Sequence, residues 1–139
     1  MNTEHTEIRS AAMFDLLTST PVAVEVEFSY STRDPYAIQV LFNPYGDQSV
    51  QWILARDLLA DGLLAEAGEG DVRIWPVMDE LDVVVLEFTT PAGQARFGAD
   101  PEDLVDFLNE TYELVEPGKE SRWFDFEQEM AMLSGDAKQ

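Results

Sequence analysis

The sequence of 139 residues has no cysteine and a single histidine, His5, which lies in the polar segment 1–7. Without thiols the chain can form neither a disulfide framework nor a thiolate metal site, and one imidazole is too few for a zinc site. A Ser-His-Asp or Cys-His catalytic arrangement would depend on His5 alone. There is also no P-loop, dinucleotide-binding glycine motif or nucleophile elbow. We therefore expect a protein that is not an enzyme, with no catalytic, metal or cofactor-binding residues.

Basic residues are scarce as well, since eight lysines and arginines stand against 28 acids and give a net charge of −20. Nucleic-acid binding gains affinity when Lys and Arg displace counterions from phosphates. A chain this acidic is repelled unless its few bases converge on one face, and in sequence they are scattered. We expect binding neither to nucleic acid nor to an anionic membrane. The acidity itself serves solubility or forms an electrostatic surface for a protein partner.

Long apolar runs are also absent. No segment approaches the roughly 18 apolar residues of a membrane-spanning helix, and the N-terminus lacks the basic and apolar regions of a secretory signal. Apolar residues nevertheless make up 45% of the chain, which is enough for one core in a chain of this length. We expect a single cytoplasmic domain over residues 1–139, with mobile tails at 1–7 and 134–139.

The clearest local pattern is the alternation over residues 22–30, where large apolar side chains occupy every second position. Period-two alternation predicts a strand with one packed face and one solvent face. Turn signals separate this strand from two further ones at 36–43 and 49–54. The sequence therefore predicts a three-stranded meander over 22–54. Residues 8–17 are ambiguous between strand and helix and are a candidate fourth strand.

A sharp corner follows the meander, because a short helix begins at 55–57 directly after the third strand. Gly62 is predicted to end this helix, and the next glycines, at 68 and 70, mark a turn. Strands at 72–76 and 83–88 are predicted to pair as a second hairpin. Three leucines form the inward face of the helix: Leu58, Leu59 and Leu63.

The last third of the sequence is predicted to be mostly helical. Thr90 and Pro91 have the types preferred at an N-cap and a first helical position, which predicts a short helix over 91–97. Asp100 is predicted to cap a longer amphipathic helix, and 123–133 is predicted to form the last one. Residues 100–129 carry 11 acids and two bases. This acidity fits the solvated faces of helices or a docking surface for a protein partner.

The order of elements predicts the α+β class, with antiparallel sheets in two hairpin or meander units packed with helices. The three tryptophans are expected in the core, because the few basic residues are scattered and form no basic surroundings for stacking on nucleic acid; they are Trp52, Trp75 and Trp123. One acidic cluster is expected to be a solvated loop and not a calcium site or a catalytic carboxylate pair; it comprises Asp79, Glu80 and Asp82.

Three segments carry a family resemblance: 34–42 (DPYAIQVLF), 51–63 (QWILARDLLADGL) and 70–76 (GDVRIWP). Their order, spacing and composition strongly resemble the SsgA-like sporulation and cell division proteins of actinomycetes, with the SsgB-like branch nearest. The resemblance extends from about residue 8 to residue 133, which is nearly the whole chain.

The resemblance implies a non-catalytic adaptor in sporulation-specific cell division. Such an adaptor would act by protein–protein contact at the septum, and would position or recruit the tubulin-like protein FtsZ or bind an SsgA-like paralogue. It also implies a homo-oligomer, with a trimer as one candidate, and a Whirly-like fold. Because Whirly proteins bind single-stranded DNA, single-stranded nucleic-acid binding is the alternative function. No partner-binding residue can be assigned from the resemblance.

Overall fold

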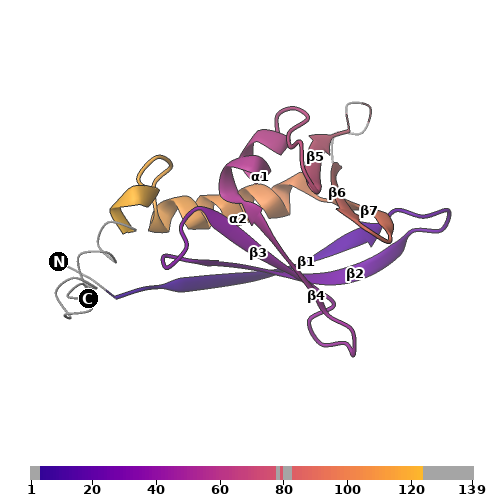
Figure 1. Ribbon diagram of the computed structural model, residues 1–139, viewed down its shortest axis with the longest axis horizontal. Coiled ribbons are helices and arrows are strands. Elements are labelled where there is room, and N and C mark those ends of the chain that lie inside the picture. The colour runs from indigo at the N-terminus through magenta and orange to yellow at the C-terminus, as the bar shows by residue number, and fades with distance from the viewer. Residues whose placement is uncertain (1–3, 78, 80–82, 124–139) are drawn as a thin grey trace.

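The computed structural model of the protein describes residues 4–77, 79 and 83–123. Within these residues seven strands form one antiparallel sheet in the order β4-β3-β2-β1-β7-β6-β5, and helices α1 and α2 accompany it (Figure 1). The elements are, in chain order, β1 (Glu7–Leu16), β2 (Val22–Ser31), β3 (Ala37–Phe42), β4 (Val50–Ala55), α1 (Arg56–Gly62), β5 (Val72–Pro76), β6 (Val84–Thr90), β7 (Gly93–Ala99) and α2 (Pro101–Leu114).

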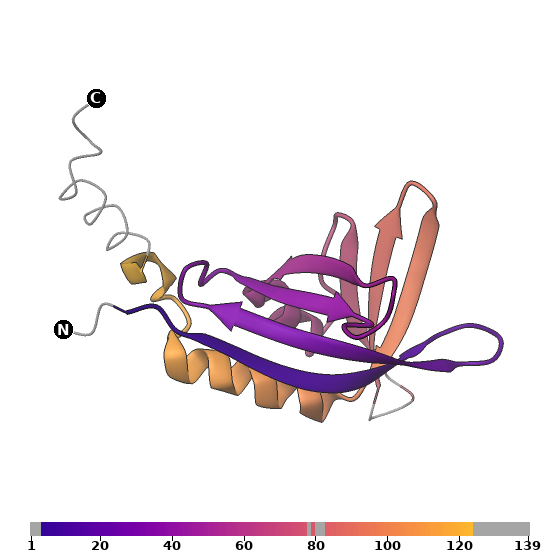
Figure 2. The same cartoon turned by 90° about the horizontal axis from the view of Figure 1, so that it is seen from below.

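The sheet consists of two units that meet along a short seam. Strands β1–β4 form one antiparallel meander, and β5–β7 form a second. The end of β1 pairs with β7, through Asp15 opposite Gly98 and Leu16 opposite Phe97. Figure 2 shows the result, in which the β6–β7 hairpin rises steeply from the long β1–β2 hairpin. The predicted two units therefore exist, but they are joined into a single sheet.

The period-two patterns predicted the strands well. The meander over 22–54 is confirmed, the ambiguous segment 8–17 forms β1, and the hairpin of 72–76 with 83–88 is confirmed. The capped helix is confirmed as α2, because the side chain of Asp100 accepts a hydrogen bond from the backbone N–H of Glu102 at 2.9 Å. The helix predicted at 123–133 lies outside the described residues except for Trp123.

The predicted short helix over 91–97 is wrong, because these residues form the β6–β7 turn and most of β7. The hydroxyl of Thr90 accepts a hydrogen bond from the N–H of Ala92 and donates one to the carbonyl of Gly93, both at 3.2 Å. Gly93 has a φ of +140°, which favours glycine and turns the chain back. A Thr-Pro pair suits a tight turn as well as a helix N-terminus. In β7, Arg96 points outward and Phe97 inward, which is the alternation of a strand.

Aromatic rings fill the space that the curved sheet encloses. The ring centroid of Phe42 on β3 lies 4.6 Å from that of Phe97 on β7 and 5.3 Å from that of Phe88 on β6. Phe28 on β2 stacks on Phe107 of α2 at 5.2 Å, so α2 packs against the same inner face. Pairs of this kind contribute about 0.5–1.5 kcal/mol each beyond their area burial. Both sheet units and α2 therefore share one core.

Helix α1 connects the two edge strands of the sheet, since it begins directly after β4 and leads into β5. Gly62 is the last residue of α1, as predicted. It does not act as a left-handed cap, because the C-cap is Leu63 in a right-handed conformation. A Cβ atom on Gly62 would lie 2.4 Å from Cγ2 of Ile74, so the glycine allows α1 to approach β5. The predicted inward leucines are buried or packed on the core: Leu58, Leu59 and Leu63.

The first residue of α1, Arg56, is a charged side chain with no exposed surface. Its Nη1 donates to the carbonyl oxygens of Val115 at 2.8 Å and Thr111 at 3.3 Å, near the end of α2. Its Nη2 donates to Oε2 of Glu120 at 2.7 Å. A buried ion pair survives only when hydrogen bonds replace the lost hydration. The carbonyls and Glu120 supply these bonds to Nη1 and Nη2, while Nε has no hydrogen-bond partner among the described residues. Arg56 therefore fastens the start of α1 to the end of α2.

Two tyrosine rings enclose the Arg56 guanidinium, whose carbon lies 5.1 Å from the ring centroid of Tyr30 and 5.0 Å from that of Tyr112. Burial raises the pKa of Tyr30 to about 12, although the charge of Arg56 acts in the opposite direction. Tyr30 therefore stays neutral and donates its hydroxyl hydrogen to the carbonyl of Pro35 at 2.8 Å. Through these rings the position of α1 is tied to β2 as well as to α2.

At Gly62 an alanine should destabilise the protein, although alanine favours a helix more than glycine does. Gly62→Ala should lower the free energy of unfolding by about 1–3 kcal/mol, because the added methyl group overpacks against Ile74. Gly70→Ala is the matched control, since its Cβ would meet nothing within 4 Å. Urea denaturation measures both. A Gly62→Ala variant as stable as the unaltered protein would contradict the close approach.

The Arg56–Glu120 pair predicts a pH dependence. The hydrogen bond from Arg56 lowers the pKa of Glu120 below its ordinary value of 4.5. When folding lowers the pKa of a carboxyl, its charge stabilises the fold fully at a pH above the unfolded-state pKa. This stabilisation is lost as the pH falls through the folded-state pKa. Glu120→Gln should therefore lower the free energy of unfolding by about 3 kcal/mol at pH 7, and by less below about pH 4.

Denaturation of the Glu120→Gln variant from pH 7 to pH 3 tests this, with the exposed Glu116→Gln as control. An equal loss in the two variants at pH 7, or a Glu120→Gln loss that does not change with pH, would show that the charge of Glu120 does not stabilise the fold.

Candidate protein-docking surfaces

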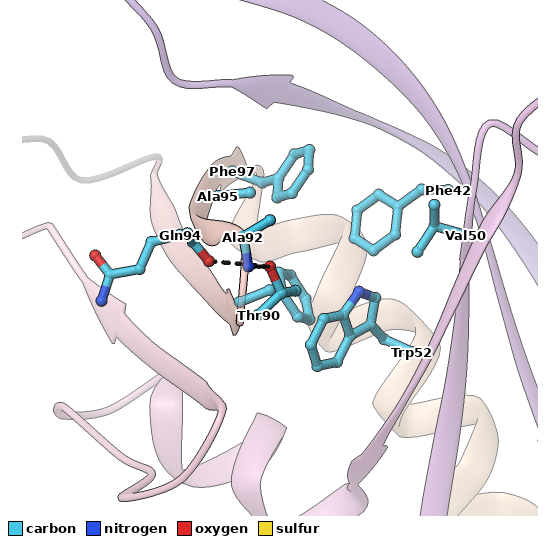
Figure 3. Close-up of a pocket in the computed structure, with 10 residues that line it drawn as sticks. Phe42, Val50, Trp52, Thr90, Ala92, Gln94, Ala95 and Phe97 are labelled. Carbon is cyan, nitrogen blue, oxygen red and sulfur yellow. Dashed lines mark hydrogen bonds between the residues drawn. The ribbon is translucent and has the colours of Figure 1, made fainter.

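An apolar hollow of about 370 Å³ opens between β4 and the β6–β7 hairpin. Figure 3 shows that Phe42 and Trp52 approach it from one side and Phe97 from the other. The ring of Trp52 also lies 4.8 Å from that of Phe88, between centroids. The hollow arises because the two sheet units diverge beyond their seam. It is lined by Phe42, Val50, Trp52, Phe88, Thr90, Ala92, Gly93, Gln94, Ala95 and Phe97.

None of the side chains that line this aromatic hollow carries a charge. The one hydroxyl among them, on Thr90, is held by the β6–β7 turn. Val50 stands at its edge and is 52% exposed, which is high for a valine on a strand. Such a lining offers apolar packing surface and no acid–base pair. The hollow therefore suits contact with an apolar side chain of another molecule better than chemistry.

A second apolar depression, of about 340 Å³, runs between the two helices. We call it the interhelical groove. From α1 and the residues after it come Ala60, Leu63 and Leu64, and from α2 come Pro101, Val105, Leu108, Asn109 and Tyr112. Leu64 is 84% exposed and Val105 is 41% exposed. Two large apolar side chains thus meet solvent at one place, where each could be covered by a partner.

Acidic side chains surround the interhelical groove. Burial raises the pKa of Tyr112 and the charge of Arg56 opposes this, while Asp57 and Asp61 of α1 lie close enough to add smaller increases. On α2 the carboxylates also act on one another, because burial and then the charges of Asp100 and Asp106 raise the pKa of Asp103. Unrelieved repulsion of this kind raises the energy of the helix surface.

The outer face of β5–β7 carries a third feature, built around the buried carboxylate of Glu87. Arg96 donates from Nε to Oε2 of Glu87 at 2.7 Å, and Nη1 of Arg73 lies 3.7 Å from its Oε1. Both guanidinium carbons face the ring of Trp75, at 5.6 and 5.9 Å from its centroid. The prediction that Trp75 lies in the core is therefore wrong. Arg73 also pairs with Glu66, so the cations are largely neutralised.

The other two tryptophans pack on the core as expected, although each remains partly exposed. His5 lies with its Nδ1 2.9 Å from Oγ1 of Thr32 and its ring 5.7 Å from that of Trp123, between centroids. In the predicted acidic loop Asp79 is exposed, as expected, while Glu80 and Asp82 lie outside the described residues.

Two features are absent from the described part of the chain. There, no group of three or more His, Cys, Asp or Glu side chains is placed to hold a metal ion. The same residues include no helix with the length and apolar character needed to cross a membrane.

Sequence reasoning missed Arg56 and Glu87 as buried charges and did not find either depression. One local signal was available for Arg56, because it stands three residues before the buried Leu59 and so shares the inward face of α1. For Glu87 the signal was its position inside an apolar strand. The depressions gave no local signal, because each is formed by segments distant in sequence.

Comparison with known proteins gives these surfaces a context. A family model described as "Streptomyces sporulation and cell division protein, SsgA" matches residues 24–120. The sporulation-specific cell division protein SsgB of Saccharopolyspora erythraea is 47% identical over 135 residues, which cover 96% of each chain. The SsgB protein of Thermobifida fusca is 46% identical over 112 residues, covering 80% of this chain and 81% of its own.

Solved structures agree with these relationships. The crystal structure of an SsgA-like sporulation-specific cell division protein from Thermobifida fusca has a TM-score of 0.87 and 41% identity, over 95% of this chain and 98% of that one. A structure from work on SsgB mutations that correlate to longitudinal cell division during sporulation of Streptomyces coelicolor has a TM-score of 0.80 and 34% identity. That match covers 86% of this chain and 96% of the other.

The α+β class with an antiparallel sheet is thereby confirmed, while the likeness to Whirly proteins stays a prediction. Because the family model matches most of the chain and relatives align over nearly its whole length, this chain belongs to the SsgA family of sporulation and cell division proteins.

Proposed function

We propose that this protein is a non-catalytic adaptor in sporulation-specific cell division, which positions or recruits FtsZ at the septum by direct protein–protein contact. The observation that carries the proposal is the nearly full-length relationship to SsgB of Saccharopolyspora erythraea, whose name places that protein in sporulation-specific cell division. The geometry supports it, since the aromatic hollow offers uncharged apolar surface of the kind found at the centres of protein interfaces.

The adaptor proposal requires two kinds of contact. One exposed, partly apolar surface joins copies of the chain, and another captures FtsZ or a paralogue of the same family. An oligomer presents several capture surfaces at once, so weak individual contacts combine into high avidity on a polymer. We assign FtsZ capture to the aromatic hollow, because its exposed Val50 and aromatic lining offer an anchor site for an apolar side chain.

Co-sedimentation with FtsZ polymers at low and moderate salt tests direct contact, and the protein should pellet with the polymer under both conditions. Val50→Glu should weaken co-sedimentation by about tenfold, because the carboxylate would lose its hydration in an apolar contact. The matched control is Val22→Glu, a valine that is also 52% exposed but does not line the hollow.

Absence of the unaltered protein from the pellet at both salt concentrations would overturn direct contact. Equal effects of the two valine variants would remove the hollow from the proposal and leave the contact itself in place.

Light scattering, on the protein alone and with purified FtsZ, tests the multivalent part of the proposal. We expect a stable homo-oligomer whose mass increases when FtsZ is added. A monomer whose mass does not respond to FtsZ would mean that the link passes through another protein, and would contradict the proposed mechanism.

Single-stranded nucleic-acid binding is a second candidate, with one observation in its favour. Arg73 and Arg96 converge on Trp75, the kind of aromatic and cationic arrangement on which bases can stack. Against it, Glu87 and Glu66 occupy both cations, and the chain's net charge is −20. We expect no change in tryptophan fluorescence on titration with an oligonucleotide at low salt, whereas a saturable change would favour this second function.

A further inference from the structure

The interhelical groove combines exposed apolar side chains with an acidic rim. That combination matches a partner with apolar and basic side chains. Leu64 is 84% exposed and Val105 is 41% exposed, and together they contribute apolar surface to a depression of about 340 Å³. The groove shares no lining residue with the aromatic hollow. A partner here would therefore use a different surface from the one assigned to FtsZ.

The shape of the groove favours a helix as its occupant. Its α2 wall is formed by Pro101, Val105, Leu108 and Tyr112, spaced by three or four residues along one face. From Pro101 to Tyr112 the helix rises about 16 Å at 1.5 Å per residue, which matches three turns of a second helix. Within α2 most backbone groups bond inside the helix, so an incoming segment must satisfy its own backbone polar groups. A helix does this and presents side chains at the same spacing.

The acidic side chains around the groove favour a positively charged partner. On α2 three exposed acids each stand about one helical turn from a lining residue, so they border the groove along its length: Glu102 three residues before Val105, Asp106 three before Asn109 and Glu113 four after Asn109. Asp57 and Asp61 border it from α1, close to Tyr112. The one base on the two helices is Arg56, which is buried and paired with Glu120.

The rim carboxylates form no salt bridge with other described residues, which leaves their repulsion uncompensated within that part of the chain. Lys or Arg side chains of a partner would relieve this repulsion while its apolar side chains cover Leu64 and Val105. Opposite charges around an apolar centre also speed association and select against acidic partners.

We propose that the interhelical groove binds a basic amphipathic helix of a protein partner, with apolar anchors on Leu64 and Val105 and basic side chains on the acidic rim. The proposal does not depend on FtsZ capture, because it concerns another surface. A second copy of this chain is disfavoured as the occupant, since a surface with this rim would meet a chain of net charge −20.

Fluorescence anisotropy with a labelled model peptide tests the proposal. The probe is a leucine–lysine peptide of about 14 residues, four helical turns, with its leucines on one face. The variant Leu64→Ser/Val105→Ser should weaken its binding by about tenfold or more, because both anchor contacts are lost. Ile53→Ser is the apolar control, since Ile53 is 58% exposed on β4 and does not line the groove.

Charge is tested by a second pair of variants with equal change in net charge. Asp57→Asn/Asp61→Asn/Asp106→Asn alters the rim, whereas Asp15→Asn/Glu25→Gln/Asp47→Asn neutralises three exposed acids on other elements. The rim variant should weaken binding several-fold more than the control, with the larger difference at low salt. Equal weakening by the two variants would mean diffuse attraction to an acidic protein and would overturn the proposal.

Self-association provides the remaining test. If a second copy covers the groove, Leu64→Ser/Val105→Ser will lower the mass measured by light scattering, and the peptide will dissociate the oligomer. Either result would overturn the proposal of a basic partner. An unchanged mass with weakened peptide binding would support it, whether or not the protein co-sediments with FtsZ.

Discussion

The buried guanidinium of Arg56 is the constraint on which the arrangement of the two helices depends. Arg56 is the first residue of α1 and directly follows β4. Its guanidinium donates hydrogen bonds to carbonyls near the end of α2 and to the carboxylate of Glu120. Its charge cannot be exposed to water without separating these elements, and it cannot stay buried without its partners. The pair thus matters less as a source of net stability than as a device that permits one relative placement of α1 and α2. The interhelical groove lies between the two helices that Arg56 connects.

The aromatic hollow has a different origin, in the sheet itself. Strand β1 joins β7 through pairs at its end, so the two meanders are free to diverge elsewhere. Rings from both units fill the resulting space near the seam, where Phe42 meets Phe97. The rings of Trp52 on β4 and Phe88 on β6 also meet across the units, and beside these ring pairs a space stays open between β4 and the β6–β7 hairpin. A fully closed barrel would have had no such opening, and a flat sheet would have exposed these rings on an open face.

Local patterns predicted most of the fold and little of the candidate surfaces. The alternation over 22–30 and the cap at Asp100 act between near neighbours, so the sequence was sufficient to place β2 and α2. The β6–β7 turn was misread because Thr90-Pro91 suits two structures, and the pairing of the following strand with β6 decided between them. Arg56 is buried by groups 55 to 64 positions away, and no local rule reports contacts at that distance. The family resemblance supplied a role, but no residue-level map of either surface.

The distribution of charge explains how so acidic a chain can present distinct surfaces. Arg56, Arg73 and Arg96 all pair with carboxylates on or beneath the surface, so they do not offset the acids of the helical face. The hollow is uncharged, the β5–β7 face is locally balanced, and the interhelical groove is bordered by acids. Under the two proposals, an uncharged apolar partner suits the hollow, whereas the groove favours a partner that brings positive charge. The position of the acids, and not the net charge of −20 as such, thereby distinguishes two apolar openings of nearly the same size.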